Sequence, residues 1–381
     1  MNILYDATPL LMRSAGVKNY HYSLLRELMP IAWPHEISLF PNLKGFPENR
    51  NEGSNYPAYE TATRLAAILA SNYLRLPAVT GAARDAELFH VTPHVMRPPR
   101  EALLTSIVHD LTPLTLPECH TESNVRYFEK FAERVLPTLD GVITPSQFVK
   151  QELIEALGVA EDKVTVIHHG VDRDFFEVSG AQIRVARRTY QLPDRYILTV
   201  GSFEPRKNLI RLIEAHGMLS EEMQKEYPLL AVGASGWKNT DIERAFRESP
   251  HARILGYVKR DLLPAVYESA SAFALPSLYE GFGMPLLEAM AAGLPVLTSD
   301  YSAPPEVVGT TGVLVDPLKV EAIAEGLRLL VGDPRSAQLM GAEARQRARG
   351  FSWQRCAEET KAFFEKVGGD MDAWLDEEDE E

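Results

Sequence analysis

The sequence predicts an α/β protein made of two doubly wound domains. Short apolar runs alternate with helical patterns almost throughout the chain, and such alternation implies parallel sheets that are covered by helices on both faces. The chain has 381 residues, which is enough for about two domains at roughly 100–200 residues each. Hydrophobic residues make up 45% of it and charged residues 24%, the composition of an ordinary globular protein.

The expected strands fall into two groups of six. Those of the first half are residues 2–6, 36–40, 88–91, 104–108, 141–144 and 164–167. Those of the second half are residues 196–200, 229–232, 253–255, 272–275, 295–298 and 312–315. One open sheet of twelve strands would be unusual, so two sheets are expected, with the boundary in the charged stretch 172–194.

Helical patterns fill most of the intervals between these strands. One covers residues 147–157, with Ser146 as its N-cap and Gly158 at its end. Another covers residues 209–219, with Asn208 as its cap. Open α/β sheets bind ligands at the carboxyl ends of their strands, so polar and glycine-rich segments that directly follow a strand are the candidate sites.

The charge and the cysteine content indicate which partners and which cellular compartment to expect. The net charge is −14, and the segment 370–381 carries eight acidic and no basic side chains, which leaves −6 for the rest. Nucleic acid is therefore not an expected partner, and residues 368–381 are expected to be a disordered acidic tail. The two cysteines, Cys119 and Cys356, lie far apart, and the chain starts without the pattern of a signal peptide. A reduced cytoplasmic setting is expected.

The first candidate site is the segment 280–288, which follows the expected strand 272–275. Gly281 and Gly283 allow backbone amides to approach a ligand closely, and the free N–H groups of a helix start near Pro285 suit an anion or a sugar oxygen. Glu280 in the loop and Glu288 in the first helical turn are expected to accept from hydroxyl groups of a sugar or a ribose. Acids that merely favour the helix dipole would explain the same spacing.

The second candidate site is the segment 201–208, which follows the expected strand 196–200. Arg206 and Lys207 stand side by side just before a helix, where Arg offers a bidentate fork and Lys a point charge. A diphosphate is the expected guest. A pair of solvated surface cations is the alternative.

Four further features of the sequence carry weaker signals. His109 directly follows a strand and can hydrogen-bond a substrate hydroxyl or stabilise charge, although a structural histidine fits as well. Gly16, in the loop after the first strand, is a weak candidate for a phosphate contact. The run from His168 to Asp174 is interpreted as a loop rather than a metal site. The helical stretch 59–76 is expected to pack on its own core, with docking on an anionic membrane as the alternative.

Taken together, these motifs resemble family 4 of the retaining glycosyltransferases. Glu280 and Glu288, with seven residues between them, resemble the E-x7-E signature of that family, and residues 201–208 resemble its diphosphate-binding segment. Residues 109–110, 169–172 and 304–309 match further landmarks. The resemblance runs from the first strand to about residue 365. It departs from the family in the first loop, where Ala15-Gly16 replaces the more common Gly-Gly.

The resemblance implies the GT-B fold, in which two Rossmann-like domains face each other across a cleft. Residues 1–172 would form an acceptor-binding domain and residues 173–351 a donor-binding domain for a nucleotide-diphosphate sugar. A carboxyl-terminal helix, about residues 352–367, would cross back to the first domain. No metal and no other cofactor is expected, because cations and helix dipole would carry out the electrostatic work.

The resemblance also implies a role for each site residue. Arg206 and Lys207 would hold the diphosphate and stabilise the leaving group, and Glu288 would accept from the ribose hydroxyls. Glu280 would hold the transferred sugar, and His109 would contact it from the first domain. The remaining expected donor contacts are the amides of Gly281, Phe282, Gly283 and Met284 on the sugar, and those of Leu287 and Gly16 on phosphate.

The segment 204–208 is similar to that of bacterial mannosyltransferases of surface-polysaccharide assembly, so the expected donor is GDP-mannose and the expected acceptor a glycan or a lipid-linked saccharide. UDP-hexoses are the main alternative donors. A sugar-nucleotide epimerase or hydrolase, and a sugar-nucleotide-binding protein without transfer activity, are the competing classes. The expected place of action is the cytoplasm, with the inner face of the membrane as a site of contact.

Overall fold

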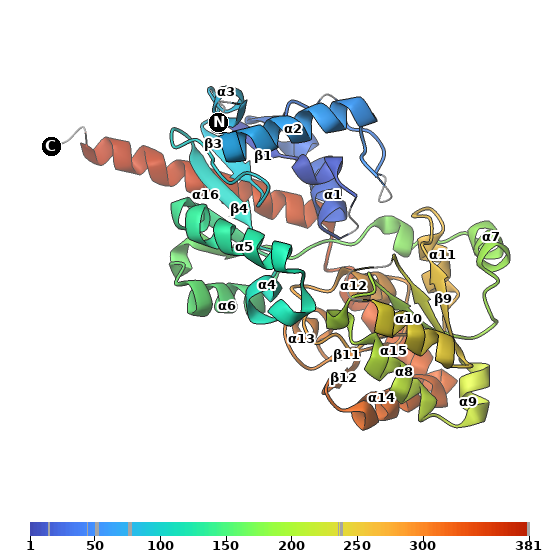
Figure 1. Cartoon of the computed structure of the whole chain (residues 1–381). Coiled ribbons are helices and arrows are strands. Elements are labelled where there is room, and N and C mark those ends of the chain that lie inside the picture. The colour runs from blue at the N-terminus through green and yellow to red at the C-terminus, as the bar shows by residue number, and fades with distance from the viewer. Residues whose placement is uncertain are drawn as a thin grey trace. The chain divides into compact units, whose positions relative to one another are not determined.

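The computed structural model describes residues 1–13, 16–43, 45–49, 53–74, 78–234, 236 and 239–378 (Figure 1). The chain divides into two compact units. Unit 1 comprises Met1–Leu114, Glu122–Gly170 and Trp353–Glu381, and unit 2 comprises Thr115–Thr121 and Val171–Ser352. Ser14 and Ala15 of the first loop and residues 75–77 of the stretch 59–76 lie outside the described residues.

Unit 1 is built on a parallel sheet of six strands in the order β2-β1-β3-β4-β5-β6. Its strands are β1 (Asn2–Asp6), β2 (Glu36–Phe40), β3 (Leu88–Val91), β4 (Leu103–Ile107), β5 (Gly141–Thr144) and β6 (Val164–Val166). All six strands expected in the first half are confirmed, with ends that differ by at most one residue. Buried apolar side chains on these strands explain the agreement.

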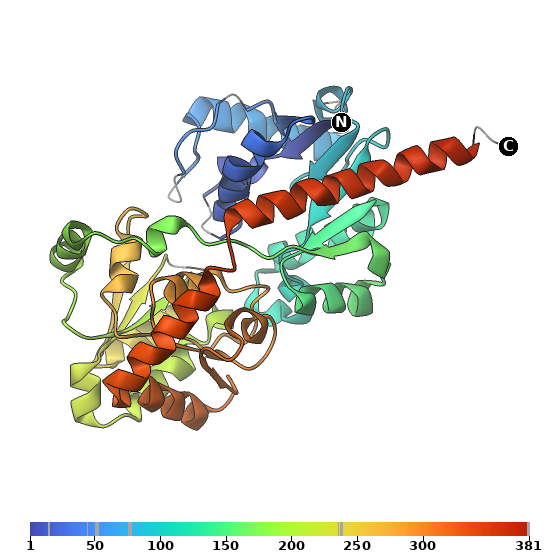
Figure 2. The same ribbon diagram turned by 180° about the vertical axis from the view of Figure 1, so that it is seen from behind.

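Helices cover both faces of this sheet. The helices that share a core with one face are α2 (Ala58–Leu74), α3 (Ala78–Ala82), α5 (Glu122–Arg134) and α6 (Gln147–Leu157). On the other face α1 (Gly16–Ile31) and α16 (Trp353–Glu378) lie side by side, as Figure 2 shows. The shorter helical segments of this half of the chain are η1 (Thr8–Leu11), α4 (Thr112–Thr115), η2 (Pro117–Cys119), η3 (Leu136–Thr138) and η4 (Glu161–Lys163).

Unit 2 contains the second parallel sheet, in the order β12-β11-β10-β7-β8-β9. Its strands are β7 (Ile197–Val200), β8 (Leu229–Val232), β9 (Ala252–Gly256), β10 (Ala272–Leu275), β11 (Val296–Ser299) and β12 (Val313–Val315). All six strands expected in the second half are confirmed. In this order β7 and β10, the strands that precede the two main candidate sites, are neighbours.

Two separate apolar cores flank the second sheet. One lies under α7 (Gly180–Tyr190), α11 (Leu263–Glu268), α12 (Met284–Ala291) and α15 (Pro334–Ala348). The other lies under α8 (Leu209–Gly217), α10 (Thr240–Glu248) and α14 (Val320–Gly332). The remaining segments are η5 (Arg173–Phe175), η6 (Pro205–Lys207), α9 (Glu221–Glu226) and α13 (Pro304–Val308).

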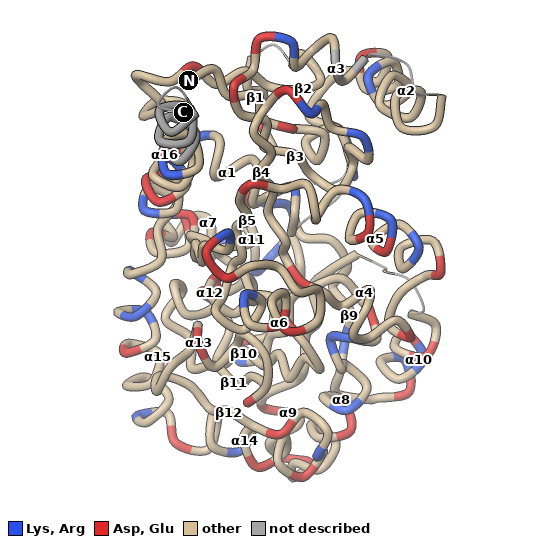
Figure 3. Tube along the Cα trace, turned by 90° about the vertical axis from the view of Figure 1, so that its left-hand side faces the viewer, with Lys and Arg blue, Asp and Glu red and all other residues tan. Residues whose placement is uncertain are grey.

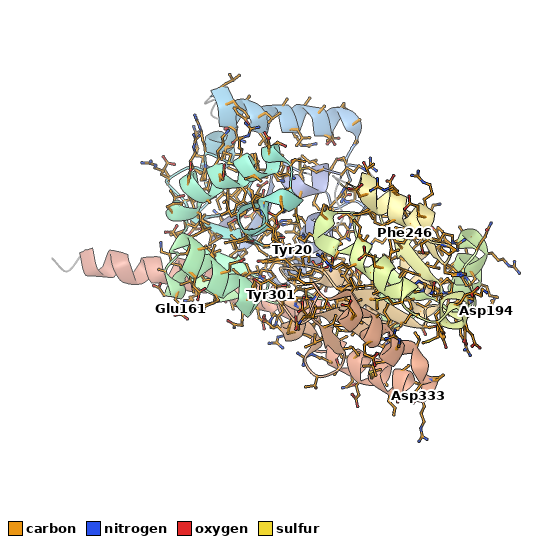
Figure 4. The ribbon with its side chains drawn as sticks, turned by 60° about the horizontal axis from the view of Figure 1, so that its bottom comes forward. Tyr20, Glu161, Asp194, Phe246, Tyr301 and Asp333 are labelled. Atoms are coloured by element: carbon orange, nitrogen blue, oxygen red, sulfur yellow. The ribbon has the colours of Figure 1, made fainter. Side chains whose placement is uncertain are left out.

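Local caps fix several helix ends. Ser146 accepts a hydrogen bond from the Val149 amide at the start of α6, and Gly158 ends that helix in the left-handed conformation, as expected. Asp333, labelled in Figure 4, caps α15 by accepting from the amides of Arg335 and Ser336. These bonds satisfy amides that have no partner within their helices.

Two expectations about the chain's organisation need correction. Apart from Thr115–Thr121, unit 2 begins at Val171, two residues before the expected 173, because the Val171 amide bonds the Phe351 carbonyl and Val171 pairs with Ser352. The helix expected at 352–367 continues to Glu378, so most of the segment 368–381, expected to be disordered, is helical. Residues 370–378 contain no proline or glycine to stop a helix. Residues 379–381 lie outside the described part.

The stretch 59–76 packs on the core only in part. Ile68 of α2 is buried and Leu65 packs against the same core, as expected, whereas Leu69 is 55% and Tyr73 67% exposed. A membrane contact of this exposed face stays a prediction. No helix among the described residues is long and apolar enough to span a membrane.

On other helices acidic and basic residues are mixed along the same helix, as α5, α8 and α10 show in Figure 3.

We predict that Gly341→Ala destabilises the protein, although alanine is normally the better residue within a helix. Gly341 lies in α15 where a Cβ would stand 2.0 Å from the Gly293 carbonyl oxygen, just past the end of α12. Overpacking of this kind costs about 1–3 kcal/mol. Urea unfolding measures the change. Gly332→Ala at the end of α14 is the matched control, because nothing lies within 4 Å of its Cβ position, and equal stabilities for both variants would contradict the prediction.

Candidate functional site

The main site of unit 2 lies at the carboxyl edge of its sheet. Because β7 and β10 are adjacent and parallel, the segments that follow them leave the sheet at the same edge. The segment after β7 forms η6 and carries Arg206 and Lys207, and the segment after β10 carries Glu280. The topology therefore brings together two motifs that stand more than seventy residues apart in the sequence.

Glu280 is the centre of a buried ion cluster. Lys207 Nζ lies 2.6 Å from its Oε1, and an Arg206 terminal nitrogen lies 3.0 Å from its Oε2. The Ser277 hydroxyl donates to Oε1 at 2.6 Å. Glu204 adds a second carboxylate, 3.7 Å from Arg206. The four charged side chains are all largely buried, so the alternative that Arg206 and Lys207 are solvated surface cations is wrong.

The charges of this cluster balance, which the sequence did not predict. Burial alone would raise the pKa of Glu280, but the charges of Lys207 and Arg206 and the hydrogen bonds from Lys207 and Ser277 outweigh it and lower the pKa to about 2. Glu280 is therefore ionised at neutral pH. A ligand meets two cations whose positions are set by carboxylates, rather than a bare positive patch.

Backbone contacts hold the two segments in register. The Leu278 amide donates to the Arg206 carbonyl oxygen at 2.8 Å, and Arg206 returns a bond to the Tyr279 carbonyl at 2.9 Å. Asn208, expected to cap α8, makes no side-chain cap bond. It has a left-handed backbone, and its amide group donates instead to the carbonyls of Pro276 and Pro317. Asn208 thus ties the second segment to the first, and the expectation of a cap was wrong.

The start of α12 places the other residues expected to contact the donor. Gly283 has a φ of 102°, which favours glycine, and its carbonyl accepts from the amides of Leu286 and Leu287. A phosphate contact by the Leu287 amide would share this donor and stays a prediction. The ring of Phe282 is buried in the core, so only its backbone can face a ligand. The roles of Gly281 and Met284 also stay predictions.

Glu288 has a different hydrogen-bond partner from the residues of the ion cluster. It is the fifth residue of α12 and so lies in the second turn, not in the first as expected, because the helix begins at Met284. The Tyr267 hydroxyl of α11 donates to its Oε2 at 2.8 Å. Burial raises the pKa of Glu288 to about 7, against the opposing effects of the Tyr267 hydrogen bond and of Arg260. The two glutamates of one motif therefore have opposite electrostatic environments.

His109 of unit 1 follows β4 and lies among aromatic rings. Its imidazole meets the ring of Tyr20 edge-on at 4.8 Å and lies 5.5 Å from the ring of His169. Burial lowers the pKa of His109 to about 4, with Asp110 opposing. A neutral imidazole can hydrogen-bond a hydroxyl group, whereas stabilisation of charge by a cationic His109 is not favoured. Gly16 is the exposed first residue of α1, and its phosphate contact stays a prediction.

A cluster of histidines and tyrosines surrounds His109. We call it the imidazole cluster; its members are Tyr5, Tyr20, His21, His90, His109 and His169. Tyr20, labelled in Figure 4, is 1% exposed and contacts four other rings of unit 1. The pKa values of His21, His90 and His169 are lowered, first by burial and then by His109.

The loop interpreted from the sequence at residues 168–174 extends only to Asp172, because Arg173 and Asp174 begin η5. His169 packs on Tyr20, and Asp172 forms an ion pair with Arg260. Among the described residues no group of three or more His, Cys, Asp or Glu side chains is placed to hold a metal ion.

Several site residues were missed by sequence reasoning. Tyr267 and Ser277 bond the two glutamates, yet a lone tyrosine or serine near a strand carries no signal of its own. Tyr20 lies four residues beyond Gly16, and its exposed or buried state cannot be read from a single helical pattern. Glu204 was visible in the motif, but its pairing with Arg206 depends on how the chain folds back.

Comparison with known proteins agrees with this geometry. Residues 185–347 match the model of the Glycosyl transferases group 1, and residues 56–175 match that of Glycosyltransferase Family 4. The O-antigen chain mannosyltransferase B of Escherichia coli is 31% identical over 376 residues, covering 94% of this chain and 98% of that protein.

Solved structures show the same fold. Sucrose-phosphate synthase from Thermosynechococcus elongatus superposes with a TM-score of 0.73 at 20% identity, over 96% of this chain and 99% of that one. HepE of Anabaena, in complex with UDP and glucose, superposes with a TM-score of 0.71 at 17% identity, over 96% of this chain and 100% of that one.

Two parallel six-stranded sheets with these structural neighbours define the GT-B fold. Within that fold class, the chain belongs to glycosyltransferase family 4, a family of retaining enzymes.

We predict that acid destabilises unit 1 through the imidazole cluster. A histidine whose pKa is lowered on folding binds fewer protons in the folded than in the unfolded chain, so stability is lost as pH falls below about 6.5 and continues to fall toward the folded pKa. For His90 the folded value is about 3, and for His109 about 4. His90→Phe should lessen the pH slope of the unfolding free energy by up to about 1.4 kcal/mol per pH unit between pH 6 and 4. Urea unfolding at several pH values measures it; an unchanged slope would refute the prediction.

Proposed function

We propose that the protein is a retaining mannosyltransferase that uses GDP-mannose and elongates a glycan or a lipid-linked saccharide in surface-polysaccharide assembly. The observation that carries the proposal is the buried cluster of Glu280, Lys207 and Arg206 at the carboxyl edge of the second sheet. The choice of mannose as the transferred sugar is supported by the O-antigen chain mannosyltransferase B, which is similar to this chain over nearly the full length of both.

The cluster suits the departure of a nucleoside diphosphate. As the bond between the sugar C1 and the phosphate oxygen breaks, negative charge grows on the phosphate and positive charge on the sugar ring. Lys207 and Arg206 stabilise the first, and the ionised Glu280 stabilises the second. The acceptor hydroxyl forms the new bond to C1 from the same face, and its proton passes to the departing phosphate. This route retains the configuration at C1.

His109 and Glu288 take binding roles in this proposal. The neutral imidazole of His109 hydrogen-bonds a hydroxyl of the transferred sugar. Glu288 accepts from the ribose hydroxyls, which change little during transfer. Gly16 and the amides that begin α12 add contacts to the donor.

A UDP-hexose is the second candidate donor, because the structural neighbour HepE is described in complex with UDP and glucose. Thermal-shift measurements with GDP, UDP, ADP and dTDP separate the two, since a ligand at 100 times its Kd adds about 2.7 kcal/mol of stability. Donor consumption with and without acceptor separates a transferase from an epimerase, a hydrolase or a non-catalytic binder. Stabilisation by GDP and acceptor-dependent consumption of GDP-mannose are the expected results.

We predict that Glu280→Gln and Glu288→Gln impair different kinetic constants. Glu280→Gln should mainly lower kcat, because a carboxylate beside the sugar helps more once charge has developed. Glu288→Gln should mainly raise the donor KM, because its contact is felt equally before and during transfer. Steady-state kinetics with varied donor, and an NMR assignment of the product anomer, provide the test. An unchanged kcat for Glu280→Gln, or an inverted product, would overturn the mechanism.

We also predict that activity persists in excess EDTA, because Lys207 and Arg206 supply the charge that a metal would otherwise bring to the diphosphate. Initial rates are measured after dialysis against EDTA and again after addition of magnesium or manganese. A complete loss that either metal restores would contradict the prediction.

A further inference from the structure

Tyr267 stands out among the buried groups that the proposed mechanism leaves without a task. It lies in α11, its side chain is fully buried, and its hydroxyl points to α12. There it donates to Glu288 Oε2 at 2.8 Å, with a longer contact of 3.3 Å to the Pro285 carbonyl oxygen. Burial and the neighbouring Glu288 raise the pKa of Tyr267 well above its usual value, so the hydroxyl keeps its proton.

The hydrogen bond from Tyr267 leaves acceptor positions of the Glu288 carboxylate open. A carboxylate offers about four acceptor positions on its two oxygens. Within the part of the chain that the structure describes, Tyr267 provides the one side-chain hydrogen bond to Glu288. Oε1 therefore keeps its acceptor capacity while Oε2 is fixed by a rigid aromatic donor. A pair of vicinal hydroxyls is the chemical group that such an oriented carboxylate accepts from best.

Two charged residues act on the Glu288 carboxyl through space. Arg260, just before α11, favours the ionised carboxyl, and Asp172, just before η5, opposes it. These two residues are themselves an ion pair. Among the charged groups of the helices that pack on α12, Glu268 of α11 and Arg345 of α15 face each other at 4.0 Å. Tyr267 is thus the group that bonds Glu288 directly, while the charges act at longer range.

We propose that Tyr267 is a positioning residue for donor recognition: its hydroxyl orients the Glu288 carboxylate so that the carboxylate accepts from the ribose hydroxyls of a ribonucleoside diphosphate. The inference rests on the proposed function, because it takes a nucleotide as the ligand of unit 2. It assigns ribose discrimination to a pair of residues on two helices rather than to Glu288 alone.

The test compares GDP with 2′-deoxy-GDP by calorimetry. The wild type should prefer GDP by at least about tenfold, the factor that one hydrogen bond to a charged group supplies. Tyr267→Phe should reduce this preference to within about threefold, by weakening GDP and leaving 2′-deoxy-GDP nearly unchanged. Glu288→Gln should show the same loss, and the double variant no further loss, because the two side chains act as one unit.

Tyr196→Phe is the matched control. Tyr196 is also fully buried in unit 2, and its hydroxyl donates to the Val266 carbonyl oxygen, next to Tyr267 in the chain. Removing this hydroxyl costs a buried hydrogen bond without touching Glu288, so both nucleotides should keep their wild-type ratio. Thermal unfolding of each variant shows that the folded protein is being compared.

A pH series adds a second readout that a structural defect would not imitate. Since the pKa of Glu288 is raised to about 7, the preference for GDP should grow as pH rises through that value. The Tyr267 bond favours ionisation, so its loss in Tyr267→Phe should move the midpoint to higher pH. Glu288→Gln should show no such midpoint.

Each outcome decides. A wild-type ratio in Tyr267→Phe, or an equal weakening of both nucleotides, overturns the inference while leaving the proposed function in place. A wild type that binds GDP and 2′-deoxy-GDP equally removes the ribose contact and the inference with it. A wild type that prefers UDP is tested with UDP and 2′-deoxy-UDP in the same variants, and one that binds neither GDP nor UDP overturns the proposed function and the inference together.

Discussion

The pairing of Glu280 with Lys207 and Arg206 is the interaction on which the rest of unit 2 depends. Charges that are almost fully buried must be compensated, and removing one partner of such a pair typically costs about 3–5 kcal/mol. The cluster therefore links the segments after β7 and β10. It also leaves a site in which cations are present and already oriented before any ligand arrives, which is the condition for electrostatic preorganisation.

The parallel sheet explains how one short motif produces two different glutamates. Glu280 lies in the loop beside η6, where two cations reach it, and it is strongly acidic. Glu288 lies in the second turn of α12, where α11 covers it. Its bonding partner is a tyrosine hydroxyl instead of a cation, and its pKa is raised. Burial acts on both carboxyls in the same direction, so the difference comes from the partners. The charged loop around Glu280 suits a reacting centre. The less charged surroundings of Glu288 suit a contact with the ribose.

Much of the fold could be predicted because its signals are local. The twelve strands are apolar runs, and Ser146 and Gly158 have the residue types that helix ends require. The site was predicted at the level of motifs, because glycines and charges that follow strands mark the edge of a sheet. Its partners could not be predicted, since Tyr267, Ser277 and the carbonyls that hold Asn208 meet the motifs only through long-range packing. The helix beyond residue 367 was missed because the acidic composition of residues 370–381 was taken as a sign of disorder, although residues 370–378 contain no proline or glycine.

The most direct test of the central claim is the binding of GDP to Glu280→Gln and to the wild type, measured by calorimetry. Glutamine keeps the size of the side chain and its ability to hydrogen-bond, but it removes one negative charge beside Lys207 and Arg206. If Glu280 tempers two cations that hold the diphosphate, the variant should bind GDP more tightly than the wild type even though it turns over more slowly. Weaker binding of GDP by the variant would contradict the account.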